Sequence, residues 1–274
     1  MNLTTIQFHS QTDNANIRLV KGTNISHTFP CHIHKSFSLG IVKKGQRVIR
    51  VKGEQHIVSS NECFMINPHQ PHSCSLEGKT GHDYWVISIN PQLLRNVFRE
   101  IGGKDAVPYF SQVKITDSSI INRLAAWLEK RARMELTDWD ELTNILGELV
   151  LRYGDEKISV QPPQIRHSVV MLASEYIEAN LTEVVRLDEI AATVHISPFY
   201  LNRMFQKEIG IPPYTYLLQT RIKKSLELLL QTNSITEVTH HLGFSDQSHF
   251  TRLFKRIIGI TPKRFLDLHR TSTP

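Results

Sequence analysis

The sequence predicts an α+β protein of two domains, and three observations support that prediction. Residues 15–90 contain short apolar and β-branched runs separated by turns, a pattern that favours a sandwich or small barrel. Beyond residue 90 the apolar spacing changes to three and four residues, which is typical of helices. Near the C-terminus one helical unit occurs twice. We therefore expect an N-terminal β-barrel with accompanying helices, then an all-α domain with two helix-turn-helix units joined by a long helix.

The overall composition sets broad limits on the class of protein. With 274 residues the chain has room for roughly two domains with cores of their own. No run of about 18 apolar residues could cross a bilayer, and the opening MNLTTIQFHS lacks the plan of a secretion signal. Three cysteines are a sparse, odd count, which indicates a reducing compartment instead of a disulfide framework. We expect a cytoplasmic protein without a membrane partner.

The net charge of +6 is concentrated at one end of the chain. Residues 197–274 contain 11 Lys and Arg against 5 Asp and Glu, so the remaining residues are neutral in sum. A basic segment beside a neutral one fits a nucleic-acid-binding domain joined to something else. A merely solvated basic surface would give the same count, so charge alone does not decide between the two.

The strands of the first domain are marked by β-branched runs. Lys44-Gly45 and Lys52-Gly53 provide turns between them. The clearest runs are Phe37–Val42, Val48–Val58, Cys63–Ile66 and Tyr84–Ile89.

Three helices are predicted next, over residues 91–102, 118–135 and 138–153. The last contains a narrow apolar stripe at alternating three- and four-residue spacing: Trp139, Leu142, Leu146, Leu149 and Tyr153. Such a stripe is either core or a seam that pairs with a second subunit. We therefore assign residues 1–153 to the first domain.

A linker is predicted over residues 154–166, because GDEKISVQPPQ combines charge, polarity and a Pro pair. The second domain then covers residues 167–274. Its first helix, His167–Asn180, has Val169, Leu172, Ala173 and Tyr176 on one face.

The repeat lies between residues 190 and 265. At an offset of 49, Leu201, Arg203, Phe205, Gly210, Ile211 and Pro213 fall on Phe250, Arg252, Phe254, Gly259, Ile260 and Pro262. The preceding helix aligns at 48, so the second copy has one extra turn residue. We predict helix-turn-helix units over 187–208 and 235–258.

Local signals place the helix ends in both copies. Ser197 is a good N-cap before Pro198, and Gly210 suits a left-handed C-cap. In the second copy, Ser234 to Glu237 reads as a capping box and Gly243 provides the turn.

The outer faces of the two second helices are the predicted DNA-reading surfaces. At about 100° per residue, the apolar side chains of each helix point inward and a polar set points outward. Each outer face has one Arg able to bind guanine or a phosphate. The predicted DNA-binding residues are Phe199, Asn202, Arg203, Gln206, Gln247, Ser248, Thr251, Arg252 and Lys255.

A single helix from Pro213 to about Gln231 connects the two units, with Leu218, Ile222, Ser225 and Leu229 on its packed side. Nineteen residues span about 28 Å, which could hold two recognition helices roughly one DNA turn apart. A plain helical bundle with solvated arginines is the alternative, and the duplicated caps, turns and Arg positions argue against it.

The segment from HISPFYLNRMF to GFSDQSHFTRLFKRIIGITPKRF resembles the DNA-binding domain of the AraC/XylS family of bacterial transcription regulators. The likeness covers about 100 residues, from near Val169 to Leu268. It implies a seven-helix domain with recognition helices near 197–208 and 245–257. It also implies a role at promoters, usually activation, through contact with RNA polymerase. Ser225 and Thr239 stand where the family pattern prefers alanine.

Residues 28–90 resemble the cupin-like sensor that often precedes this domain, through His32-Ile33-His34, Gly45 and PHQPH. In metal-binding cupins an HxH pair, a Glu four residues on and a later His hold one ion, but Ser38 stands at the Glu position here. We therefore expect neither a catalytic metal site nor a catalytic residue. His32, His34, Ser38 and His72 are the candidate effector-binding residues.

The His and Cys side chains leave three alternatives open: a pocket for an organic ligand, a structural role, or a zinc or copper site. The possible ligands of such a metal are Cys31, His32, His34, His72 and Cys74. The sequence does not identify a cofactor. A small-molecule effector is favoured over a zinc or copper ion as the ligand of the first domain.

These patterns together predict a sequence-specific transcription regulator of the bacterial nucleoid, with activation as the expected sign of regulation. Its expected partners are double-stranded promoter DNA, RNA polymerase, a small effector and a second copy of the chain. It is not expected to be an enzyme. The alternative function is a cupin-type metalloenzyme with a helical appendage.

Overall fold

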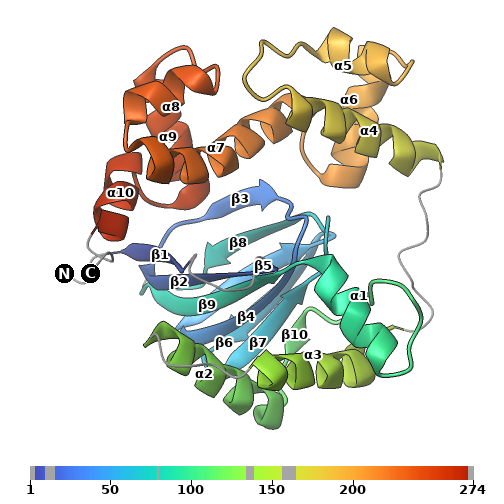
Figure 1. Ribbon diagram of the computed structural model, residues 1–274, viewed down its shortest axis with the longest axis vertical. Coiled ribbons are helices and arrows are strands. Elements are labelled where there is room, and N and C mark those ends of the chain that lie inside the picture. The colour runs from blue at the N-terminus through green and yellow to red at the C-terminus, as the bar shows by residue number, and fades with distance from the viewer. Residues whose placement is uncertain (1–3, 10–15, 79, 134–138, 156–164, 271–274) are drawn as a thin grey trace. The chain divides into compact units, whose positions relative to one another are not determined.

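The computed structural model describes residues 4–9, 16–78, 80–133, 139–155 and 165–270 (Figure 1). The chain forms two compact units, Met1–His27 with Ile33–Gln161, and Pro162–Pro274 with the short segment Thr28–His32. Phe29–His32 is strand β3 of a sheet whose other strands belong to the first unit. Most of the predicted linker, residues 156–164, lies outside the described residues.

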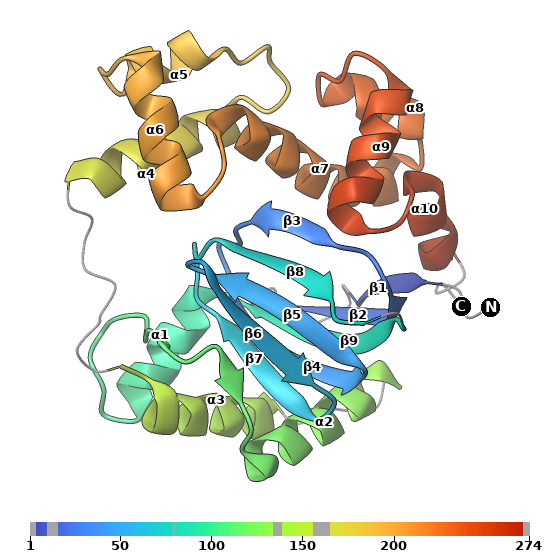
Figure 2. The same cartoon turned by 180° about the vertical axis from the view of Figure 1, so that it is seen from behind.

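The first unit is built from two antiparallel sheets that lie face to face and close a barrel (Figures 1 and 2). The larger sheet has the order β1 (Thr5–His9), β2 (Ile17–Ile25), β9 (His82–Ile89), β4 (Phe37–Lys44), β7 (Glu62–Ile66) and β10 (Lys114–Ile115). The smaller sheet has the order β3 (Phe29–His32), β8 (His72–Leu76), β5 (Gln46–Val51) and β6 (Glu54–Ser59).

Alternation along β4 separates two faces of the larger sheet. Phe37, Leu39 and Ile41 enter a core that also contains residues of the helices. Ser38 and Gly40, pointing to the opposite face, therefore look into the barrel. The register pairs Ser38 with Ser88 of β9 and with Ile66 of β7.

Three helices cover the outer face of the larger sheet: α1 (Pro91–Glu100), α2 (Ser118–Ala132) and α3 (Trp139–Tyr153) (Figure 1). The predicted apolar stripe of α3 is part of this core. Leu142, Leu146 and Leu149 are fully buried, while Trp139 and Tyr153 pack against the same cluster. The stripe is therefore filled by the chain's own core and is not a free seam for a second subunit.

The second unit contains seven helices within residues 165–270, as the resemblance implied. They are α4 (Ile165–Ala179), α5 (Leu187–Thr193), α6 (Pro198–Ile209), α7 (Pro213–Thr232), α8 (Ile235–His241), α9 (Gln247–Ile258) and α10 (Pro262–Arg270). Helix α7 runs between the α4–α6 group and the α8–α10 group (Figures 1 and 2).

Two predicted apolar faces differ from the structure. On α4 the buried residues are Val170, Ala173 and Ile177, whereas Leu172 is 51% exposed. The stripe is therefore rotated by about one residue from the predicted one. On α5 Leu187 is 37% exposed because it is the first residue of a seven-residue helix. The α+β class itself is confirmed. No helix within the described ranges is long and apolar enough to cross a bilayer.

Candidate DNA-binding surface and effector site

Helix α6 begins and ends where the sequence predicts. The Ser197 hydroxyl accepts a hydrogen bond of 3.3 Å from the Tyr200 amide, and Pro198 occupies the first turn. Gly210 ends the helix at a φ of 78°, a left-handed conformation that favours glycine. Leu201 and Phe205 are fully buried. These contacts fix which face of α6 looks outward.

The outward face of α6 carries the four predicted DNA-contacting side chains. Arg203 and Gln206 are exposed, Asn202 is half-buried and Phe199 is 75% exposed. The face therefore combines a guanidinium, two amides and an apolar ring, which are the groups that contact base edges.

Helix α9 has a different cap from α6. The Asp246 carboxylate accepts a hydrogen bond of 2.7 Å from the His249 amide, and this bond keeps the pKa of Asp246 below its usual range. The sequence argument missed this cap, although Asp is a preferred N-cap residue. Gly259 ends α9 at a φ of 95°. Phe250, Phe254 and Ile258 are buried.

The outward face of α9 repeats the plan of α6. Gln247, Ser248, Arg252 and Lys255 are exposed, and Thr251 is half-buried. The Gln247 side-chain oxygen accepts a hydrogen bond of 3.2 Å from the Thr236 hydroxyl of α8. Arg203 and Arg252 are both solvent-accessible, as a DNA-reading role requires.

The two turns differ by one residue, as the offset of the repeat predicts. Four residues separate α5 from α6, with His195 at a φ of 55°, and five separate α8 from α9, with Gly243 at 65°. The predicted capping box at α8 is only half formed. Ser234 accepts from the Glu237 amide, but its own amide donates to the Thr232 hydroxyl instead of the Glu237 carboxylate.

A buried arginine of α7 holds the turns of the second unit together. Arg221 donates to the carbonyl oxygens of Leu181 at 2.8 Å, Glu183 at 2.6 Å and Gly243 at 3.0 Å. Burial lowers the pKa of its guanidinium. The sequence argument counted Arg221 only as surface charge. Arg221 directly precedes Ile222, which the sequence places on the packed side of α7, and this adjacency was the available sign that Arg221 could be buried.

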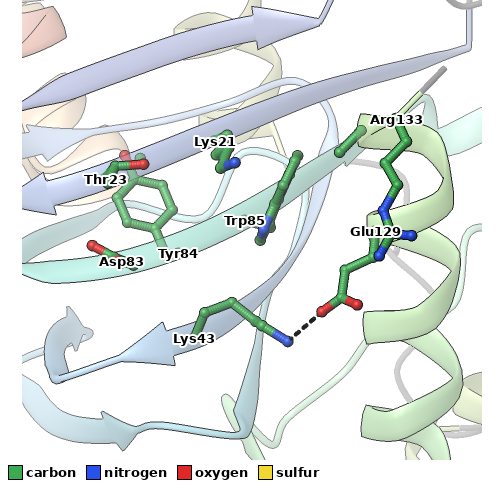
Figure 3. Close-up of a pocket in the computed structure, with 10 residues that line it drawn as sticks. Lys21, Thr23, Lys43, Asp83, Tyr84, Trp85, Glu129 and Arg133 are labelled. Carbon is green, nitrogen blue, oxygen red and sulfur yellow. Dashed lines mark hydrogen bonds and ion pairs between the residues drawn. The ribbon is translucent and has the colours of Figure 1, made fainter.

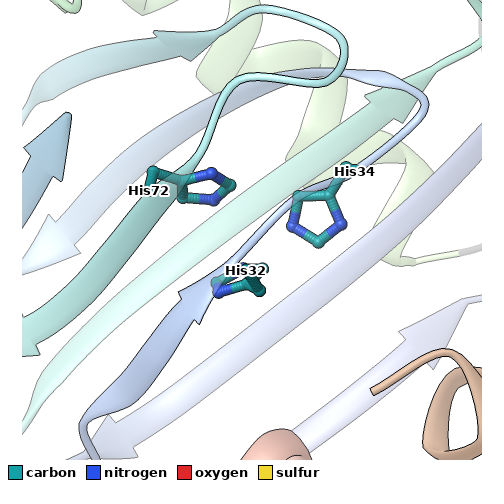
Figure 4. Close-up of side chains that lie close together, drawn as sticks. All are labelled: His32, His34 and His72. Atoms are coloured by element: carbon teal, nitrogen blue, oxygen red, sulfur yellow. The ribbon is translucent and has the colours of Figure 1, made fainter. Parts of the chain in front are cut away.

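In the first unit, three of the predicted effector residues lie together. Ligand atoms of His32, His34 and His72 all lie within 4.8 Å of one another (Figure 4). Among the described residues no other group of three or more His, Cys, Asp or Glu comes as close, and neither Cys31 nor Cys74 joins this one. Alternation places Cys31 on the other face of β3 from His32, and burial raises the pKa of its thiol.

Ser38, the fourth predicted effector residue, faces the barrel interior from the larger sheet. It is only 4% exposed, and its hydroxyl has no hydrogen-bond partner among the described residues. A buried hydroxyl normally has a partner. Ser38 therefore places an unpartnered polar group inside the barrel.

The other end of the barrel interior is closed by side chains. The Arg47 guanidinium lies 4.1 Å from the Tyr84 ring centroid and 5.6 Å from that of Phe64. Gly40 and Gly22 make room for these rings, because a Cβ at either position would collide with Phe64 or Tyr84. Arg47 also donates to Nε2 of His82 at 3.1 Å. Burial, with this charge beside it, lowers the pKa of His82 to about 3.

A separate cleft of about 460 Å³ lies on the outer face of the larger sheet, beside α2 (Figure 3). The Lys21 ammonium lies 4.9 Å from the Trp85 ring centroid, and Lys43 forms an ion pair of 2.9 Å with Glu129. No sequence signal marked this cleft. Five of its ten lining residues are charged, and two of these, Lys43 and Glu129, pair with each other.

A duplicated helix-turn-helix with two outward arginine faces, joined to a barrel with a polar interior, defines a ligand-responsive DNA-binding regulator. Residues 14–159 match the AraC-like ligand binding domain, and residues 190–267 match a helix-turn-helix domain family. The chain belongs to the AraC family of transcription regulators. The resemblance seen in the sequence is thereby confirmed.

Two curated relatives and one solved structure illustrate the likeness. The "Uncharacterized HTH-type transcriptional regulator YbfI" of Bacillus subtilis is 30% identical over 228 residues, which is 82% of each chain. The "Probable transcriptional regulator LumQ" of Photobacterium leiognathi is 24% identical, over 88% of this chain and 92% of that protein. The crystal structure of an apo ToxT variant from Vibrio cholerae has a TM-score of 0.66 at 13% identity, covering 93% of this chain and 98% of ToxT. That level of identity shows a shared fold.

Proposed function

We propose that α6 and α9 read two successive major grooves of one promoter site, with Arg203 and Arg252 as the main base-reading residues. The observation that carries the proposal is the equivalence of their exposed faces at the 49-residue offset. Helix α7 has 20 residues, a length of about 30 Å, which is close to the rise of one DNA turn. The exposed basic Lys255 and Lys224 would contact phosphates.

Effector binding inside the barrel would bias how the second unit engages DNA, through two arrangements already in equilibrium. The Ser38 hydroxyl, which points into this interior, is buried without a hydrogen-bond partner among the described residues. Ring nitrogens of His32, His34 and His72 lie within 4.8 Å of one another. A fold neighbour, ToxT, has been crystallised as "unsaturated fatty acid bound wild-type ToxT", with a TM-score of 0.58 at 13% identity. An effector held in the same fold is the mode of regulation that we propose for this chain.

The regulator would act as an activator, as a homodimer that contacts RNA polymerase. Because the apolar stripe of α3 is buried, a dimer needs another surface. Leu151 on α3 is 71% exposed and offers one. Leu151→Glu should convert the dimer to a monomer in sedimentation velocity, while Glu54→Lys, an exposed change in β6, should not.

We propose no catalytic activity for the chain. The relatives reported above are named as regulators, and Ser38 replaces the carboxylate that the cupin resemblance would require. Oxygenase or isomerase turnover by the metal-loaded protein would instead favour the metalloenzyme alternative.

The experiment that tests DNA reading directly is a genomic footprint followed by gel retardation on the recovered promoter. The specific complex should weaken steeply with salt, with log K falling linearly against log salt. An interaction module that touches polymerase without DNA would give no retarded complex and no footprint of its own.

A further inference from the structure

The cleft beside α2 lies where neighbouring strands of the larger sheet change from apolar to polar on their outer face. On β2, Leu19 is buried beneath the helices, and Lys21, two residues on, points to the same side of the sheet. On β4, Ile41 is followed in the same way by Lys43. Trp85 of β9 pairs directly with Lys21 and with Ile41 in the sheet. The cleft therefore continues the helix-facing side of the sheet beyond the apolar core, within the first unit.

This face of the sheet is not the barrel interior. Tyr84, next to Trp85 in β9, points to the opposite side, where its ring packs on the Arg47 guanidinium. The Trp85 side chain instead belongs to the core that the sheet shares with α2. A molecule in the cleft is therefore held by different side chains from a molecule in the barrel interior.

The two carboxylates of the cleft are already engaged within the protein. Asp83 accepts a hydrogen bond of 2.7 Å from the Asn24 amide. Glu129 pairs with Lys43 at 2.9 Å, and this hydrogen bond, together with the charges of Lys43 and Arg133, keeps the pKa of the Glu129 carboxyl below its usual range. The cleft keeps an excess of positive charge, because three basic side chains line it against these two acidic ones.

Lys21 supplies the third basic group. Its ammonium lies 4.9 Å from the Trp85 ring centroid, and among the described residues it has no hydrogen bond or ion pair. Figure 3 shows Lys21, Trp85 and Lys43 on the strands, across from Glu129 and Arg133 at the end of α2. An ammonium has three N–H donors, so Lys21 can hold an anionic group while it stays beside the indole.

The size and lining of the cleft select the class of ligand. Its volume of about 460 Å³ falls within the roughly 300–1,000 Å³ of small-molecule sites. The excess of positive charge disfavours a metal cation. Trp85 and Ala132 add apolar surface among the charged groups. An organic acid satisfies both features, because its anionic group pairs with an ammonium and its apolar part packs on an aromatic ring.

We propose that this cleft binds a small organic anion, with Lys21 as its main charge partner. The anionic group pairs with the Lys21 ammonium in the positive field that Arg133 strengthens, and the apolar part of the molecule lies against Trp85. Lys43 and Glu129 join β4 to α2 across the cleft, so a bound molecule contacts both the sheet and the helix. This site is separate from the effector site proposed in the barrel interior and does not depend on it.

The probe that tests this site is para-(trifluoromethyl)benzoate, whose binding to the full chain is followed by fluorine NMR. The neutral para-(trifluoromethyl)benzamide has nearly the same shape without the charge. The parent should bind one equivalent of the benzoate, and should bind it about tenfold or more tightly than the benzamide, because a hydrogen bond to a charged group is worth at least that factor in affinity.

Two substitutions of Lys21 test its role. Lys21→Met removes the ammonium but keeps an unbranched side chain, and should weaken benzoate binding by about tenfold or more. Lys21→Arg keeps the charge and should retain binding. Lys44→Met is the matched control, because Lys44 is an exposed residue of β4 that does not line the cleft. Circular dichroism should confirm that the variants fold.

The position of the bound probe is read from the indole N–H signals of the protein. The Trp85 signal, assigned by its absence from Trp85→Phe, should shift as benzoate is added. The signals of Trp127 and Trp139, which are not among the residues that line the cleft, should stay in place.

Three outcomes would overturn the site: no saturable binding of the benzoate by the parent, equal binding of the benzoate and the benzamide, or parent-like binding by Lys21→Met. Each of them leaves the proposals on DNA reading and on the barrel interior intact, because those proposals rest on other residues.

Discussion

Arg221 of α7 donates a hydrogen bond of 3.0 Å to the carbonyl oxygen of Gly243, in the turn between α8 and α9. The same guanidinium donates to the Leu181 and Glu183 carbonyls, in the segment between α4 and α5. One side chain in the connecting helix therefore ties both helix-turn-helix units to α7. A fixed arrangement of the units is what reading of two grooves requires.

We predict that Arg221→Lys destabilises the second unit by about 2–4 kcal/mol, because one ammonium replaces a fork that serves three carbonyls. Thermal unfolding followed by far-UV circular dichroism measures the loss. All three tryptophans, Trp85, Trp127 and Trp139, belong to the first unit, so their fluorescence transition should stay unchanged. Arg186→Lys is the control, since the Arg186 side chain is 69% exposed and pairs with the neighbouring carboxylate of Asp188. Equal stability of both variants would refute the role of Arg221.

We predict that acid weakens the first unit through His82. Its pKa is about 3 in the folded protein, below the ordinary value of 6.5, so only the unfolded chain takes up a proton between these pH values. Stability from this group is thus present above pH 6.5 and falls as pH falls, by about 1.4 kcal/mol per pH unit, until pH nears 3. His82→Gln keeps an acceptor for Arg47 but does not titrate.

Urea unfolding followed by tryptophan fluorescence checks this prediction. From pH 6.5 to 5.0 the parent should lose about 2 kcal/mol more than His82→Gln. Parallel stability curves for the two proteins would contradict the buried, neutral state of His82.

We predict that Lys255→Ala weakens binding to all DNA sequences alike, because an ammonium on the exposed face of α9 would contact a phosphate and not a base edge. The slope of log K against log salt should fall by about 0.9. Gel retardation over a range of salt, on specific and random duplexes, measures both. Lys44→Ala removes the same charge from an exposed position in the first unit, and its slope should match that of the parent. A loss confined to the specific duplex would reassign Lys255 to base reading.

The features that the sequence predicts well are those that depend on residues close together in the chain. Ser197, Gly210 and Gly243 favour their caps and turns through local preferences, so both ends of α6 and the turn before α9 could be located, whereas the Asp246 cap of α9 could not. Strands β1, β2, β3, β8 and β10 were not among the predicted runs, because their sequences mix polar with apolar residues.

Contacts between residues far apart in the sequence could not be predicted. Arg47 is buried over the rings of Tyr84 and Phe64, and Arg221 is buried against three carbonyls. Composition counts both as surface charge, because burial of an arginine depends on partners elsewhere in the chain. Which of the candidate His and Cys residues lie together could not be derived from the sequence, because it depends on how the strands pair in the folded sheet.

The most direct test of the two-groove reading is base discrimination by Arg203→Ala and Arg252→Ala. Binding-site selection from a randomised pool, with each variant and the parent, would show which base positions lose preference. Each substitution should cost about 1–3 kcal/mol and relax one position, and the two relaxed positions should lie about 10 base pairs apart. Parent-like selection by both variants, or relaxation of the same position by both, would contradict the claim that α6 and α9 enter successive grooves.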